Sequence, residues 1–183
     1  MPGAECKAPG SSDEEMKVYL SENAFIDLLL SSAEVYKKES LGFLLGYKPE
    51  DRFIVEHAFS FQTARRKHKG VIFHHKNHKK IEPILEKFDR LQIIGDFHSH
   101  TQFGVTKGLP IPSDEDIREM REGHIYLIVA INNNEKTLNW GENRDGSISG
   151  SVGNFFFKIA AYFLNGSAAI KRARIHCPFP PEF

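Results

Sequence analysis

LQIIGDFHSH, residues 91–100, joins an apolar run to two histidines. The run from Leu91 to Phe97 predicts a buried strand, because it is short and mainly apolar. Residues two apart in a strand point to the same face, so His98 and His100 would project together into one pocket. This stretch therefore predicts a strand that ends in a pair of imidazoles.

Asp116 follows at the start of an expected helix, in the sequence Pro112-Ser-Asp-Glu-Asp116. A carboxylate oxygen from Asp116 would complete three protein ligands and leave a fourth position open for water. That pattern is typical of catalytic zinc, whereas structural zinc is usually held by four protein ligands. We therefore expect His98, His100 and Asp116 to bind one catalytic Zn²⁺ ion, although Asp114 could compete as a ligand.

The composition is ordinary for a globular chain of one domain. Of its 183 residues 40% are hydrophobic and 26% charged, and the formal net charge is zero. A neutral chain has no global field that favours nucleic acid or a membrane surface. The two cysteines form no CxxC motif, and no signal peptide or membrane-spanning run is evident, so we expect a cytoplasmic protein. The expected organisation is a disordered tail over residues 1–15, one domain over 16–177 and a C-terminal tail over 178–183.

Local patterns predict an α+β domain. Ser21 is a good N-cap for a helix that ends near Lys37, and Ser113 for one that ends near Glu122. A third helix is expected over 81–90, where Pro83 fits only in the first turn. Strands are expected over residues 17–20, 41–47, 52–65, 124–131 and 137–140.

Two segments carry finer predictions. Residues 52–65 alternate Phe53, Val55, His57, Phe59 and Phe61, which is the period of a half-buried strand. Residues 155–164 could be a helix by composition. However, Asn165-Gly166 is a strong hairpin signal, so we predict antiparallel strands over 155–164 and 170–175.

Two further segments, one before the histidines and one after them, add to the pattern. Glu39-Ser-Leu-Gly-Phe-Leu-Leu-Gly46 precedes them, and Pro112-Ser-Asp-Glu-Asp116 follows. With His98-Ser-His100, these segments resemble the zinc metalloprotease signature of the JAMM family, also called MPN-plus or JAB, of archaeal or bacterial type. The resemblance covers roughly residues 17–176. It implies the MPN/JAB architecture, similar to cytidine deaminases: a three-layer-like mixed sheet with flanking helices.

The resemblance also implies catalytic roles. His98, His100 and Asp116 would bind zinc, and Glu39 would act as the general base for a metal-activated water. Ser113 would donate a hydrogen bond to the developing oxyanion. The implied reaction is hydrolysis of an amide bond at the tail of ubiquitin or a ubiquitin-like protein. Twelve residues, Thr101 to Pro112, separate His100 from Ser113, and this loop is longer than in the family pattern.

Each residue taken alone has a simpler interpretation. Glu39 follows two lysines and could be a solvated acid at a helix end. Ser113 could serve only as a helix N-cap, and Asp116 could serve only to complement the helix dipole. The order of the three motifs favours the catalytic interpretation.

A basic stretch, RRKHKGVIFHHKNHKK, spans residues 65–80 with seven Lys or Arg, four His and no acid. It could be a solvated loop or a surface for an acidic partner. Nucleic acid is disfavoured, because the stretch has one aromatic residue and the chain is neutral. A second metal site at His74, His75 and His78 is also disfavoured, because no Cys or acid accompanies them.

The leading hypothesis is a zinc-dependent isopeptidase or peptidase, with a homodimer plausible. The alternative is a non-catalytic MPN-like scaffold that assembles with partners. A zinc deaminase is a third class, but its His-x-Glu and Pro-Cys-x-x-Cys motifs are not found in the sequence.

Overall fold

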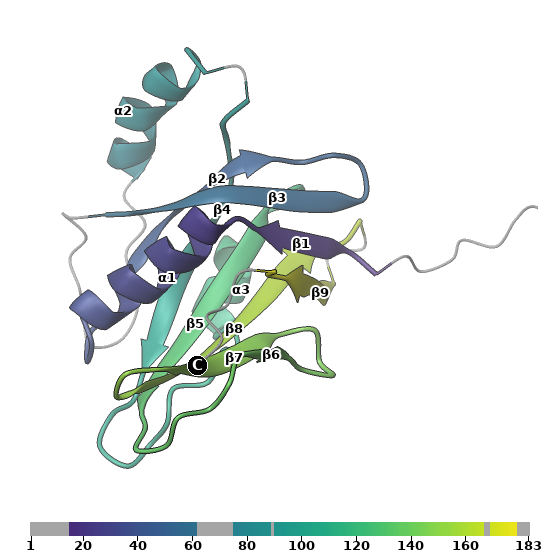
Figure 1. The fold of residues 1–183 in the computed structure, drawn as a ribbon. Coiled ribbons are helices and arrows are strands. Elements are labelled where there is room, and N and C mark those ends of the chain that lie inside the picture. The colour runs from purple at the N-terminus through teal and green to yellow at the C-terminus, as the bar shows by residue number, and fades with distance from the viewer. Residues whose placement is uncertain (1–14, 62–74, 89, 167–168, 179–183) are drawn as a thin grey trace, which may run out of the picture.

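The computed structural model describes residues 15–61, 75–88, 90–166 and 169–178 (Figure 1). The elements, in chain order, are β1 Lys17–Leu20, α1 Glu22–Glu34, β2 Leu41–Tyr47, β3 Arg52–Ser60, α2 His75–Leu85, β4 Gln92–Thr101, α3 Asp114–Glu119, β5 Ile125–Asn133, β6 Gly141–Glu142, β7 Ile148–Val152, β8 Phe155–Leu164 and β9 Ile170–His176. No helix among these residues is long and apolar enough to cross a membrane. The predicted tails lie almost entirely outside the described residues.

Seven strands close into a β-barrel. The sheet runs β5-β4-β2-β3-β1-β9-β8, and β8 pairs back onto β5 in antiparallel register from Tyr126↔Tyr162 to Asn133↔Phe155. The described helices have only 13, 11 and 6 residues. The expected α+β fold, a three-layer-like mixed sheet with flanking helices, is therefore wrong. The chain is mostly β, because the pairing of β5 with β8 curls the sheet on itself and leaves no open, two-sided layer.

The barrel interior holds the main core. Alternate residues of β5, among them Leu127 and Val129, point inward beside Phe97 of β4, and all three are fully buried. Helix α1 adds Phe25 and Leu28 to the same core. Ser21 caps α1 by accepting the amide of Ala24, as predicted. Burying such side chains stabilises the barrel by roughly 1.5–3 kcal/mol each.

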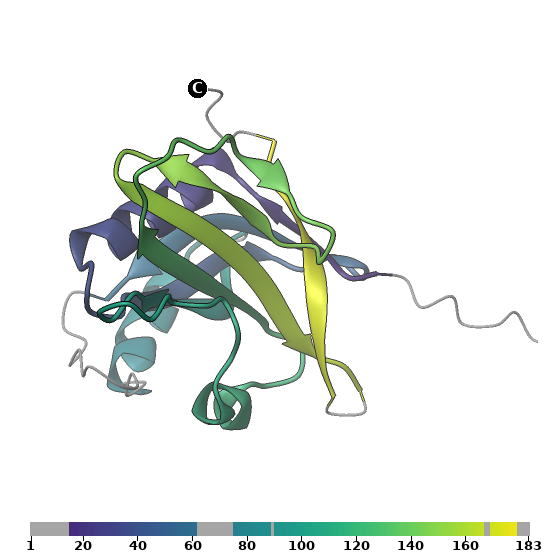
Figure 2. The ribbon, with the colours of Figure 1, turned by 90° about the horizontal axis from the view of Figure 1, so that it is seen from below.

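Two smaller clusters lie on the outside of the barrel wall. One joins Leu41 and Phe43 of β2 to Phe61, with Ile81 of α2 packed against it. The other joins Met120, directly after α3, to the outward side chains of β5 and β8, which are Tyr126, Ile128, Ala160 and Tyr162. Figure 2 shows α3 standing outside the barrel. The outer face of β2 and β4 therefore lies between these two apolar clusters.

A β-bulge divides the predicted alternation in β3. Leu45 pairs with His57 but Gly46 pairs with Val55, so Glu56 is an extra residue. A bulge reverses which face the following side chains take. Phe53 and Val55 point into the core, whereas His57 and Phe59 point outward and Ala58 takes the inward position. The expectation of one continuous face was wrong beyond the bulge.

Most local predictions are confirmed, but several boundaries differ. Helix α3 ends at Glu119 rather than near Glu122. Helix α1 ends at Glu34, before Lys37 adopts a left-handed φ of 76°. Helix α2 begins at His75 rather than 81, so Pro83 lies near its end and not in its first turn. Residues 137–140 form no strand, while β6 and β7 were not predicted. The hairpin of β8 and β9 is confirmed, pairing Ala161 with Ala173.

Candidate metal centre

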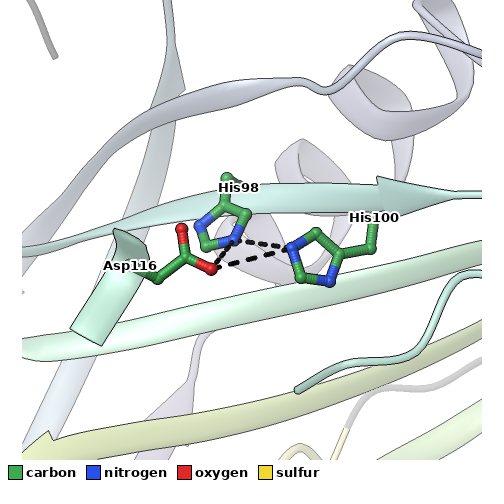
Figure 3. A group of neighbouring side chains, drawn as sticks. All are labelled: His98, His100 and Asp116. Carbon is green, nitrogen blue, oxygen red and sulfur yellow. Dashed lines mark hydrogen bonds and ion pairs between the residues drawn. The ribbon is translucent and has the colours of Figure 1, made fainter. Parts of the chain in front are cut away.

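The outward side chains of β4 meet the first turn of α3. The Nε2 atoms of His98 and His100 lie 3.0 Å apart, and Asp116 Oδ2 lies 3.5 Å from the first and 3.9 Å from the second. The three side chains point toward one another (Figure 3). These three residues could hold a metal ion, since each offers one ligand atom and these atoms all lie within 4.8 Å of one another. Among the described residues they form the one group of this kind, and Asp114 is not part of it.

A backbone carbonyl orients His100. Its Nδ1 lies 2.7 Å from the carbonyl oxygen of Leu109, to which it donates. The proton is thereby held on Nδ1, so the lone pair of Nε2 faces His98 and Asp116. Metal-binding histidines usually have such a partner for the second ring nitrogen.

Ser113 and Asp116 form a capping box at the start of α3. Asp116 Oδ2 accepts the Ser113 amide at 2.6 Å and its hydroxyl at 2.7 Å, while Ser113 Oγ accepts the Asp116 amide at 3.2 Å. The N-cap prediction for Ser113 is confirmed. The hydroxyl proton is directed at Asp116, so the cap also sets the orientation of the carboxylate.

Glu39 lies at the entrance of β2, in the same cleft as His98 and Asp116. Burial raises the pKa of Glu39; the charge of His98 opposes this, and the nearby Asp116 and Glu115 add to it. The neighbouring residue, Ser40, is held to β4 by two bonds. Its amide donates to Ser99 Oγ at 2.8 Å, and its carbonyl accepts the Ser99 amide at 2.9 Å.

The three ligand groups shift one another's protonation. Burial lowers the pKa of His100, and the neighbouring His98 lowers it further. Burial alone would also lower the pKa of His98, but its hydrogen bond to Asp116 and nearby carboxylates raise it instead. Burial acts to raise the pKa of Asp116, yet His98 and the bonds from Ser113 hold it well below its usual range. Asp116 is therefore a carboxylate, the form that binds metals.

A cleft of about 610 Å³ extends from His98 along β4. Its apolar lining comes mainly from Leu41, Phe43, Ile93 and Met120, and acidic and basic groups stand among them. Asp96 also lines it, and burial raises the pKa of this carboxyl to about 7. The sequence reasoning missed Asp96, although it stands two residues before His98 on the same strand face.

The basic stretch lies partly outside the described residues, which exclude 62–74. His74 falls in that gap, and the side chains of His75 and His78 are not described. The predictions about this stretch and its histidines stay untested.

Comparisons with known proteins give a family and a fold. Residues 21–141 match Prok-JAB, the prokaryotic homologs of the JAB domain. No curated protein matches the sequence. The solution structure of protein DSY2949 from Desulfitobacterium hafniense is similar with a TM-score of 0.57 and 16% identity, over 87% of this chain and 92% of that one. At this identity the likeness concerns the fold alone.

Proposed function

Because this chain belongs to the Prok-JAB family, the prokaryotic homologs of the JAB domain, we propose that it is a zinc-dependent isopeptidase or peptidase. Its substrate would be an amide bond at the tail of ubiquitin or a ubiquitin-like modifier protein. The observation that carries the proposal is the convergence of His98, His100 and Asp116. Two of them, His98 and Asp116, line a cleft that Glu39 also lines.

The donor set suits zinc. Two ligands that bind zinc at about 2.0–2.1 Å with tetrahedral angles lie about 3.3 Å apart. The three separations here, 3.0, 3.5 and 3.9 Å, bracket that value. Two neutral imidazoles and one carboxylate are also the ligands of known catalytic zinc sites.

Zinc bound by these residues would lower the pKa of a water molecule toward neutrality and polarise the substrate carbonyl. The protein residues then move the protons. Glu39 would accept the proton of the attacking water and pass it to the leaving amine, a role favoured by its raised pKa. Ser113 would donate to the oxyanion after its hydroxyl turns away from Asp116 Oδ2.

The cleft is suited to an extended tail. It continues from His98 toward His124 with apolar side chains on its walls, while Glu115, Glu119 and other carboxylates stand beside them. A partly apolar cleft with both acidic groups and the arginines Arg118 and Arg121 on its walls would bind an extended peptide with apolar and charged side chains.

The test is a cleavage panel of ubiquitin-like fusions, run with zinc-loaded protein and with Glu39→Gln. The variant should keep one equivalent of zinc and lose about 10²–10⁴-fold in turnover, because it lacks the proton acceptor. Glu34→Gln on α1 is a matched control, since Glu34 is exposed and outside the cleft. Equal turnover of Glu39→Gln and wild type would refute the assigned base. Failure of the purified protein to bind zinc would instead favour a non-catalytic scaffold.

A further inference from the structure

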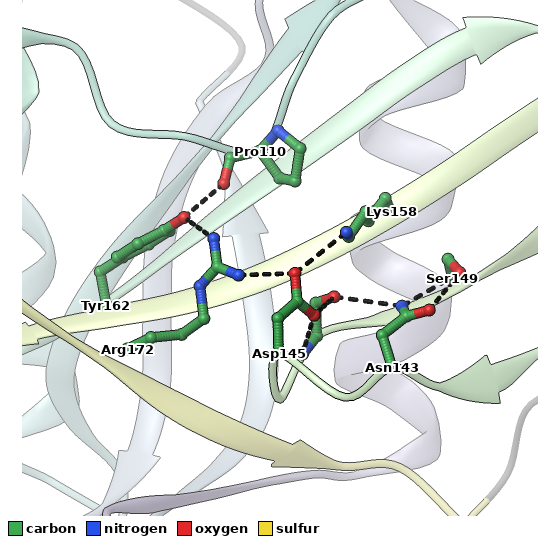
Figure 4. Close-up of polar contacts among 8 residues, drawn as sticks. Pro110, Asn143, Asp145, Ser149, Lys158, Tyr162 and Arg172 are labelled. Carbon is green, nitrogen blue, oxygen red and sulfur yellow. Dashed lines mark hydrogen bonds and ion pairs between the residues drawn. The ribbon is translucent and has the colours of Figure 1, made fainter.

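Three consecutive residues near the end of the long loop are each held by a hydrogen bond. The side-chain amide of Asn132 accepts the Gly108 N–H at 2.8 Å and donates to the Gly108 carbonyl at 3.1 Å. The Leu109 carbonyl accepts the His100 Nδ1–H at 2.7 Å. The hydroxyl of Tyr162 donates to the Pro110 carbonyl at 2.7 Å (Figure 4). The loop is thus fixed on both sides of the carbonyl that orients His100.

The two anchoring side chains are buried. Asn132 is 4% exposed and Tyr162 is 6% exposed, so water competes little for either bond. The Gly108 backbone lies directly against that of His100, since a Cβ at Gly108 would lie 2.4 Å from the carbonyl oxygen of His100. Loop and strand therefore lie in backbone contact at this point.

An ionic network behind Tyr162 sets the direction of its hydrogen bond. Arg172 donates from Nη2 to the Tyr162 oxygen and from Nη1 to Asp145 Oδ2 at 2.6 Å. Lys158 donates to the same carboxylate oxygen at 3.1 Å. Because an arginine can only donate, the Tyr162 oxygen accepts from it and its own proton goes to Pro110.

We propose that Asn132 and Tyr162 are positioning residues for the metal centre, which act on His100 through the Leu109 carbonyl. By clamping Gly108 and Pro110 they hold the His100 proton on Nδ1 and keep Nε2 ready for the metal. Neither side chain hydrogen-bonds to His98, His100 or Asp116. The inference rests on the proposed function only in taking His100 as a ligand.

The first readout needs no metal. In metal-free, ¹⁵N-labelled protein at a pH where imidazole is neutral, His100 should be the Nδ1–H tautomer. Tyr162→Phe and Asn132→Ala should each shift His100 toward the Nε2–H tautomer, measured by long-range ¹H–¹⁵N spectra. The matched controls are Tyr47→Phe, at the far end of β2, and Asn133→Ala, whose side chain is exposed. Tyr162→Phe keeps the ring, so it decides the question if Asn132→Ala does not fold.

The second readout is the zinc dissociation constant. Each variant should weaken zinc binding about 10-fold, the lower end of the effect of removing such partners, and the controls should not. An unchanged His100 tautomer in both variants would overturn the inference, whatever their activity. A wild-type protein that binds no zinc would refute the metal site instead, and the tautomer would still decide the role of Asn132 and Tyr162.

Discussion

The Ser40 amide donates its hydrogen bond to the side-chain hydroxyl of Ser99 rather than to a backbone carbonyl. Ser99 Oγ accepts the Ser40 amide at 2.8 Å, while the Ser99 amide donates to the Ser40 carbonyl at 2.9 Å. Ser99 is fully buried and stands between the two histidines on the opposite strand face. It therefore ties the residue next to Glu39 to the strand that carries the metal ligands.

Ser99→Ala should lower turnover without removing the metal. The change leaves the buried Ser40 amide without its acceptor, which costs about 1–3 kcal/mol of stability. A small displacement of Glu39 should reduce kcat by about 10- to 100-fold. Steady-state kinetics measure kcat, and the zinc content of the purified variant shows whether the metal is retained.

The control for this variant is Ser151→Ala. Ser151 is also buried and accepts a bond from Asn134, but it lies on β7, away from the cleft. It should lose comparable stability and keep its kcat. If both variants lost kcat in proportion to stability, the link from Ser99 to Glu39 would be wrong.

Gly108→Ala should weaken metal binding. A Cβ at this position would meet the backbone of His100 at 2.4 Å, so the loop must move away and carry the Leu109 carbonyl with it. We expect the zinc dissociation constant to rise about 10-fold or more, measured with a competing chelator. Gly141→Ala, where the Cβ meets open space, is the control. Unchanged zinc affinity would show that the loop tolerates the displacement.

Zinc should raise the melting temperature of the protein. A ligand that binds only the folded state at 100 times its dissociation constant stabilises it by about 2.7 kcal/mol. For a chain of this size the shift is about 5–10 °C. Calorimetry with zinc and with EDTA measures it, and His98→Ala should abolish the difference. A shift that survives in His98→Ala would place the bound zinc elsewhere.

Asp145 should stabilise the fold above about pH 4. Burial acts to raise its pKa, but hydrogen bonds from Ser147 and Lys158 hold the pKa below the ordinary value. A lowered folded-state pKa contributes stability above the unfolded pKa, and this is lost as the pH falls through the folded pKa. Because 38% of the side chain is exposed, solvent screening limits the effect to about 1 kcal/mol.

Asp145→Asn tests this contribution by urea unfolding at several pH values. The variant should be less stable than wild type at pH 7, and the gap should narrow steadily as the pH falls below about 4. Asp51→Asn is the comparison variant and should show a smaller gap, because Asp51 pairs with the adjacent Arg52 and their side chains are 46% and 43% exposed. A gap that does not change with pH would mean that the carboxylate charge contributes nothing.

More of the candidate site than of the fold could be predicted from the sequence. Strand alternation alone implied that His98 and His100 share a face, and the Ser113 N-cap put Asp116 on the first turn of α3. The approach of α3 to β4 depends on the loop between them. This loop is held by hydrogen bonds from Gly108 to Asn132 and from Tyr162 to Pro110, which join residues far apart in the sequence. No local pattern encodes such bonds.

The layered α+β expectation failed for a related reason. Alternation and hairpin signals report that β5 and β8 exist, and both were predicted. They do not report that β5 pairs with β8 on one side and β4 on the other, which closes the barrel. Nor do they reveal the bulge at Glu56, which turned Phe59 outward.

The sequence by itself determined the local features: the caps of α1 and α3, the hairpin of β8 and β9, and the shared face of the two histidines. These depend on backbone preferences and on neighbours within a few residues. Only the tertiary structure decided the barrel, the cleft and the meeting of Asp116 with His98. Those depend on which distant segments pair to bury apolar surface and satisfy backbone groups, a choice made by the whole chain at once.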